Sequence, residues 1–288
     1  MSRRQTWRLT DALLLGGLLV LAILATRGVW AEIFSIAVRD DEQSHILLAI
    51  PIAAWLAWVR RDRLRSARPR WSIMGPLVVA AGWALAWFGY AEGVEFAMHS
   101  GVIMVLLGVV LAIIGPNVMV RFMPAVIALL FLIPVPGRIR QQIALPLQEV
   151  SAKVTEFGLD IVGVPVARAT NLLTINGQDV VVAEACNGMR MVAALGLITF
   201  AYVFSVPMRN SVRILILLAS PLVAIVVNVI RLIPTALLYG YSDTTTAEAF
   251  HDWSGWLVLL LAVLMLWMIV EALRWIEVPI APYALGEE

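Results

Sequence analysis

The chain has 288 residues, of which 61% are hydrophobic and only 14% are charged, and its mean hydropathy is +0.89. A soluble domain is about half apolar and about a quarter charged, so this composition excludes a single water-soluble core. The net charge of +1 gives no indication of nucleic-acid binding, and the single cysteine excludes an intrachain disulfide or a thiolate metal cluster. The composition predicts an all-α integral membrane protein, with one polytopic membrane domain over residues 1–288.

Eight apolar runs follow one another along the chain, and most approach the length of a helix that crosses roughly 30 Å of hydrocarbon. They predict a bundle of about eight transmembrane helices over residues 10–29, 44–59, 73–90, 100–115, 119–135, 186–206, 211–238 and 253–276.

The stretch 136–185, between the fifth and sixth runs, is less apolar than the rest of the chain. Within residues 138–160, apolar side chains recur at helical spacing: Ile139, Ile143, Leu147, Val150, Val154 and Phe157. This pattern predicts an amphipathic helix that lies at the outer membrane interface or packs over the bundle. Residues 165–183 contain Asn-Gly between short β-type runs, which predicts a small hairpin or an extended loop.

Arginines gather in alternate connections between the runs. The N-terminus carries Arg3, Arg4 and Arg8, and the connection after the second run has six arginines between residues 60 and 70. Because short cytoplasmic segments are enriched in Arg and Lys, both termini are expected to be cytoplasmic. The segment 136–185 is also basic, but long segments weigh less in this rule.

The only cysteine lies in the sequence AEACNGMR and is a candidate nucleophile. Cys186 is expected where the sixth run begins. A helix N-terminus or a nearby cation such as Arg190 favours the thiolate form, which attacks carbonyl groups. Asn187 and Gly188 supply a small and polar surrounding. The alternative is an inert cysteine packed among apolar side chains, and the local sequence leaves both open.

Arg231 interrupts the seventh run between AIVV and LIPTALL, and its expected depth is near the bilayer centre. An arginine there costs roughly 2.5–3.5 kcal/mol on insertion scales and usually faces a polar cavity with a function. Asn228 lies three residues earlier on the same helical face, and Pro234 is expected to loosen the backbone hydrogen bonds one turn back. The alternative is a structural salt bridge to Glu184 or Asp252.

His251 opens the eighth run in the sequence AFHDWSGW. A histidine near pH 7 accepts and returns a proton, although an ordinary interfacial histidine beside Trp253 and Trp256 is the alternative. The predicted topology brings Cys186, Arg231 and His251 toward the same outer surface. A thiol nucleophile, a histidine base and a cation for an oxyanion are the groups that thioacyl chemistry needs.

At these residues the chain resembles the exosortase/archaeosortase family, over roughly residues 40–275. The matching blocks occur in the family's order: SHILLAIPIAAWLAWVRR, FLIPVPGRIRQQIALPLQEVSA, GVPVARATNLLTI, VVVAEACNGMR, NVIRLIPTALL and the histidine of AFHDWSGW. The resemblance implies a membrane-embedded cysteine transpeptidase without a cofactor, with the family's Cys, Arg and His carried over to Cys186, Arg231 and His251.

The resemblance also implies partners and a location. Substrates would carry a C-terminal sorting motif, typically of the Pro-Glu-Pro (PEP-CTERM) type, then a transmembrane helix and a basic tail, and the acceptor would be a lipid or glycan. The protein would lie in a bacterial or archaeal plasma (inner) membrane, with its active site facing the periplasm or exterior. Candidates for substrate binding or for ordering the catalytic groups are Glu184, Asn187, Arg190 and Asn228. Asn187 stands where the family usually has serine, and this difference leaves the exact sorting motif open.

Other functions stay open at this stage. A metal hydrolase would use His45, His99 and His251, which are all expected on the outer face, although no His-x-x-x-His spacing supports a zinc site. A transporter or assembly scaffold would use Arg231 to bind an anion, although the sequence has no repeated halves or matching broken helices. A catalytically inactive relative would bind sorting tails without cutting them.

Overall fold

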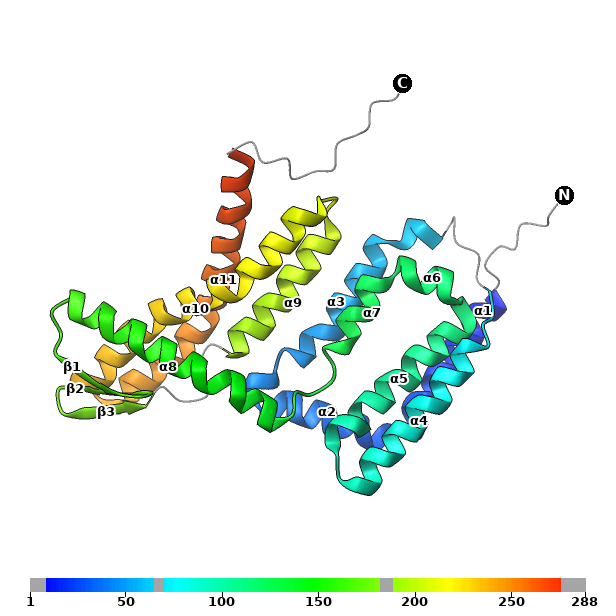
Figure 1. Ribbon diagram of the computed structural model, residues 1–288, viewed down its shortest axis with the longest axis horizontal. Helices are drawn as coiled ribbons and strands as arrows, with labels where there is room; N and C mark the ends of the chain where they lie inside the picture. The colour runs from blue at the N-terminus through cyan, green and yellow to red at the C-terminus, as the bar shows by residue number, and fades with distance from the viewer. Residues whose placement is uncertain (1–8, 65–69, 182–188, 276–288) are drawn as a thin grey trace. The chain divides into compact units, whose positions relative to one another are not determined.

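The computed structural model describes residues 9–64, 70–181 and 189–275 (Figure 1). These residues are mostly helical and include one small antiparallel sheet. The contacts divide the chain into two compact units, Met1–Pro136 and Gly137–Glu288, which are described in turn. This architecture is that of a multi-pass membrane protein, as the composition predicts.

The first unit contains the helices α1 (Leu9–Ala25), α2 (Arg27–Arg39), α3 (Ile46–Val59), α4 (Met74–Glu92), α5 (Glu95–Ile114), α6 (Pro116–Arg121) and α7 (Met123–Leu130), with 3-10 turns at Asp41–Gln43 and Arg61–Leu64. Helices α4 and α5 form its closest pair because glycines recur every seventh residue of α4. Gly75, Gly82 and Gly89 are all buried, and a Cβ added at Gly82 would lie 2.7 Å from the carbonyl oxygen of Gly101 on α5.

The second unit contains α8 (Gly137–Ile161), the strands β1 (Val166–Ala169), β2 (Leu172–Ile175) and β3 (Gln178–Val181), and the helices α9 (Met189–Ser205), α10 (Asn210–Tyr241) and α11 (Thr244–Trp275). The three strands form one antiparallel sheet in the order β1-β2-β3.

The turn between β2 and β3 is the one that the Asn-Gly pair predicts. Asn176 and Gly177 have φ values of +52° and +75°, the left-handed backbone of a two-residue hairpin turn. The side-chain amide of Asn176 donates to the carbonyl of Gly240 at 3.1 Å and ties this turn to the end of α10. The predicted hairpin is therefore confirmed, and β1 adds a third strand to it.

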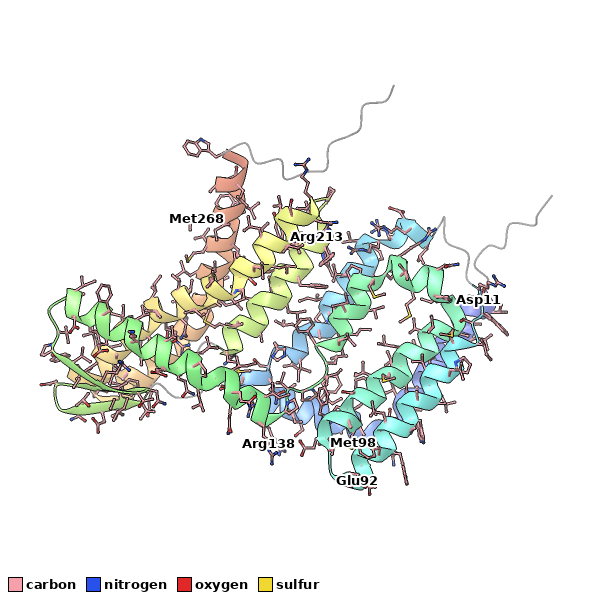
Figure 2. The ribbon with its side chains drawn as sticks, in the orientation of Figure 1. Asp11, Glu92, Met98, Arg138, Arg213 and Met268 are labelled. Carbon is pink, nitrogen blue, oxygen red and sulfur yellow. The ribbon has the colours of Figure 1, made fainter. Side chains whose placement is uncertain are left out.

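Helices α9, α10 and α11 share one apolar core. Its buried members come from all three helices: Met191, Leu195, Val223, Ala224, Val227, Val258, Ala262 and Leu266. At the turn between α9 and α10, labelled by Arg213 in Figure 2, the guanidinium of Arg213 donates to the carbonyl of Val203 at 3.0 Å and lies over the Phe204 ring. This arginine closes the turn by binding a carbonyl near the end of α9.

The number of spans is lower than the eight runs predict. Within the described residues, five helices are long and apolar enough to cross a membrane, or six if α1 and α2, which meet at a 77° bend, count as one span. The described part of α9 is apolar but has 17 residues. The fifth run, 119–135, is not one helix, because α6 ends at Arg121 and α7 begins at Met123 with Pro124 in its first turn; the two helices have six and eight residues.

Helix α11 begins earlier than expected. It starts at Thr244, within the sequence expected to form an outer loop, rather than at residue 253. The carboxylate of Asp243 accepts from the backbone N–H of Thr246 at 2.9 Å and from the Thr246 hydroxyl at 2.7 Å, which is the geometry of an N-cap. His251 therefore lies about two turns inside a helix instead of at its first residue.

Candidate functional site

Arg231 is a buried cation on the inward side of α10. Its side chain is 9% exposed, and Asn228 one turn earlier is 2% exposed. Helix α10 continues past Pro234, which lies inside it, as far as Tyr241. The hydroxyl of Thr235 donates to the carbonyl of Arg231 at 2.8 Å, one turn back in the same helix.

The guanidinium of Arg231 connects α10 to α11. Its Nε donates to the hydroxyl of Ser254 at 3.1 Å, and one terminal nitrogen donates to the carbonyl of His251 at 3.2 Å. The Ser254 hydroxyl in turn donates to the same carbonyl of His251 at 3.1 Å. These three bonds form a closed triangle, which holds the cation and the backbone of His251 in one place.

The triangle binds His251 through its backbone and not through its ring. The imidazole nitrogens are not consumed by these three bonds, and the side chain of His251 is half-buried. Ser254 lies three residues after His251, on the same side of α11, and is 5% exposed. The arrangement fixes a positive charge at the backbone of a residue that carries an imidazole, and a cation and an imidazole are the groups that stabilise an oxyanion and carry a proton.

Helix α10 is longer than a membrane span needs to be, and Arg231 lies in its second half. At about 1.5 Å per residue, its 32 residues extend about 48 Å, well beyond roughly 30 Å of hydrocarbon. Counted from Asn210 beside the arginine-rich turn, Arg231 lies about 31 Å along the helix. The depth of Arg231 in the membrane remains a prediction, because the length of a helix alone does not give its position or tilt in a bilayer.

The first turn of α9 lies at the same level as this cation. Met191 belongs to the apolar core that includes Val227 on α10 and Val258 on α11, each four residues from Arg231 or Ser254. Arg190 is exposed in this first turn.

Three predicted site residues, Cys186, Glu184 and Asn187, lie outside the described residues. Of the others, the structure brings Arg231 and His251 together and buries Asn228 in α10. It gives no description of the Asp252 side chain, which the sequence left as a partner of Arg231. The roles of all seven predicted residues remain predictions.

The histidines offered for a metal site come from both units, His45 and His99 from the first and His251 from the second. His45 is buried before α3, with its Nδ1 3.2 Å from the carbonyl oxygen of Glu42, and His99 is buried in α5, with its Nε2 3.4 Å from a carboxylate oxygen of Glu32. Among the described residues, no three histidine, cysteine or acidic side chains form a group that would hold a metal ion. Only His251 lies beside the Arg231 triangle.

Ser254 is the site residue that the sequence interpretation missed. The sequence carries its signal, because Ser254 follows His251 at the three-residue spacing that places both on one helix face. A small polar residue at that spacing in an otherwise apolar run indicates a buried partner. The neighbouring Trp253 and Trp256 instead indicated an ordinary segment at the membrane interface.

A comparison with known families matches most of the chain to one family. The model of the transmembrane exosortase (EpsH) family matches residues 30–268, which include the Cys186 motif, Arg231 and His251. No curated protein and no solved structure matches the chain significantly.

Proposed function

Because the chain belongs to the transmembrane exosortase family, we propose that this membrane sorting enzyme is a cysteine transpeptidase in which Cys186, Arg231 and His251 are the catalytic residues. It would cleave C-terminal sorting signals of exported proteins through a thioacyl intermediate and transfer the proteins to an acceptor. The observation that carries the proposal is the triangle of hydrogen bonds that joins the buried Arg231 to the backbone of His251 and to Ser254.

Chain connectivity supports the placement of Cys186 near this triangle. Cys186 precedes the first residue of α9, Met189, by three residues, which span at most about 11 Å of extended chain. Since that turn of α9 shares a core with residues one turn from Arg231 and Ser254, the thiol would reach the same neighbourhood. No other cysteine is present in the chain to serve as the nucleophile.

The reaction would begin with the Cys186 thiolate attacking the scissile carbonyl carbon. A carbon–sulfur bond forms, and the carbonyl electrons move onto the oxygen as an oxyanion, which the guanidinium of Arg231 stabilises. When the intermediate collapses, the carbon–nitrogen bond breaks and the His251 imidazolium gives its proton to the leaving amine. The sorted protein is then held as a thioester on Cys186.

The second half of the reaction would transfer this protein. The neutral His251 imidazole takes the proton of an acceptor amine or hydroxyl, on a lipid or glycan, as it attacks the thioester. The carbon–sulfur bond breaks and the thiolate returns. Water in place of the acceptor would give hydrolysis. Glu184, Asn187, Arg190 and Asn228 would order these groups or contact the substrate.

The location would be a bacterial or archaeal plasma membrane, with both termini cytoplasmic and the site facing the periplasm or exterior. The α9–α10 turn, with Arg209 and Arg213, would lie at the cytoplasmic surface. The other end of α10 and the beginning of α11 would then lie outside. A substrate whose transmembrane helix ends in a basic tail follows the same charge rule, so its motif would arrive at the level of Arg231.

A reporter protein that ends in a sorting tail tests the proposal. Co-expression with the wild-type chain should convert the reporter to a shorter, released or transferred form. Cys186→Ala, Arg231→Ala and His251→Ala should each abolish this conversion at unchanged expression. Arg27→Ala, which removes an exposed arginine of α2, is the matched control and should process normally. Full processing by Cys186→Ala would contradict the proposal.

A further inference from the structure

Helix α8 has three distinct faces. Its buried residues are small, polar or close to one end: Ala144, Gln148, Ser151, Ala152, Thr155 and Leu159. Its large apolar residues at helical spacing, here called the apolar stripe, are between 43% and 70% exposed: Ile139, Ile143, Val150, Val154, Phe157 and Ile161. A third face carries exposed charged side chains, namely Glu149, Lys153 and Asp160.

The apolar stripe is not the face by which α8 packs on its own unit. At 3.6 residues per turn, the centre of the stripe lies about 140° around the helix axis from the centre of the buried face. Close packing uses a glycine instead, because a Cβ added at Gly158 would lie 2.7 Å from the Cδ1 of Ile233 on α10. The sequence allowed two roles for this stripe, contact with the membrane interface or packing over the bundle. Within this unit, the stripe does not pack over the bundle.

The part of α10 that α8 covers lies beyond Arg231. Ala152 of α8 shares a core cluster with Leu232, and Leu159 shares another with Ala236. Figure 1 shows α8 running across α10 rather than alongside it. Helix α10 is about 18 Å longer than the hydrocarbon is thick. With the Arg209–Arg213 turn at one membrane surface and α10 along the membrane normal, the segment that α8 covers lies past the hydrocarbon.

We propose that the apolar stripe of α8 inserts into the interfacial layer of the phospholipid bilayer, at the membrane surface nearest Arg231. An exposed stripe of large apolar side chains is costly in water, and at this level the neighbouring medium is the boundary between lipid headgroups and acyl chains. The charged face of α8 lies beside the stripe and faces the aqueous side. A helix with one apolar and one charged face is the form that lies in such a boundary.

This insertion fixes the depth of the site. Helix α8 is attached to α10 just beyond Arg231, so lipid contact along its length holds the Arg231–Ser254–His251 triangle at a constant distance from the membrane surface. A sorting motif that follows a transmembrane helix directly would then arrive at that level. The consequence for catalysis rests on the proposed function, whereas the insertion of α8 does not.

Spin labels on the full-length protein in phosphatidylglycerol–phosphatidylethanolamine vesicles test the insertion. Labels are placed at Val150→Cys and Val154→Cys on the stripe, and at Glu149→Cys and Lys153→Cys on the charged face, all in a Cys186→Ala background. Each pair compares adjacent residues about 100° apart on the same turn, so a change in overall folding would affect both members alike. Collisions with oxygen report lipid, and collisions with a water-soluble nickel chelate report water.

The stripe labels should collide more with oxygen than with nickel, and the charged-face labels should show the reverse. High nickel collisions at Val150→Cys and Val154→Cys would show a water-exposed stripe and overturn the proposal. Low collisions with both reagents would show that protein, either another segment or a second copy, covers the stripe, and would also overturn it. Because these readings do not depend on reporter processing, they stand apart from the test of catalysis.

Discussion

Replacing Ser254 with alanine tests whether the Arg231 triangle positions the catalytic groups. The change removes one oxygen that accepts from Arg231 Nε and donates to the carbonyl of His251, both at 3.1 Å. A hydrogen bond to a charged group contributes about 1.5–3 kcal/mol, and a buried donor without a partner costs a similar amount. If that loss appears in the transition state, the rate of thioester formation falls about 10- to 150-fold.

The assay is single-turnover processing of the sorting-tail reporter by purified protein in vesicles, at several enzyme concentrations. We expect Ser254→Ala to lower the limiting rate with little change in the concentration for half-maximal rate, because Ser254 bonds Arg231 and not the substrate in this account. Ser254→Thr keeps the hydroxyl and should retain most of the rate.

Ser220→Ala is the matched control. Ser220 is also buried in this unit, but its hydroxyl donates to Leu217 of its own helix at 2.9 Å, away from Arg231. It should process the reporter at nearly the wild-type rate. A wild-type rate for Ser254→Ala, together with an inactive Arg231→Ala, would refute the positioning role of the triangle.

Two further predictions concern stability. Gly82→Leu should reduce the free energy of unfolding by about 1–3 kcal/mol and so lower the Tm of the protein in detergent, because a Cβ at this position meets the Gly101 carbonyl. Gly16→Leu, which has open space around it, should leave the Tm unchanged. Equal Tm values for the two variants would contradict the α4–α5 packing. The hydrogen bonds from Thr246 hold the pKa of Asp243 below its usual range, so the stabilisation by this cap is complete above the ordinary aspartate pKa and is lost as the pH falls through the lowered one. The Tm difference between wild type and Asp243→Ala should therefore be largest near pH 7 and shrink below about pH 4, and a difference independent of pH would contradict the cap.

The sequence predicted the local elements of the second unit well. The helical spacing from Ile139 to Phe157 predicted α8, and the Asn176-Gly177 pair predicted the β2–β3 turn. Both signals are local, since a side-chain period and a left-handed turn depend on neighbours in the chain. The start of α11 was placed too late because hydropathy does not detect a cap such as Asp243.

Depth and partners were harder to predict from the sequence. A hydropathy run does not fix the ends of its helix, since the seventh run predicted residues 211–238 whereas α10 has 32 residues and ends at Tyr241. The depth of Arg231 in the membrane remains a prediction. The fifth run looked continuous because one proline, Pro124, does not lower its mean hydropathy enough to divide it. The hydrogen bond from Arg231 to the backbone carbonyl of His251 could not be predicted from the sequence either, because every residue has a backbone carbonyl.

Capture of the thioacyl intermediate tests the central proposal most directly. The full-length protein is mixed with a sorting-tail substrate and quenched in acid, and the peptide that contains Cys186 is analysed by mass spectrometry. The account predicts a mass increase equal to the cleaved substrate on Cys186, removed by neutral hydroxylamine and absent from Cys186→Ala. Processing of the tail by Cys186→Ala at the wild-type rate, or an acyl group on another residue, would contradict it.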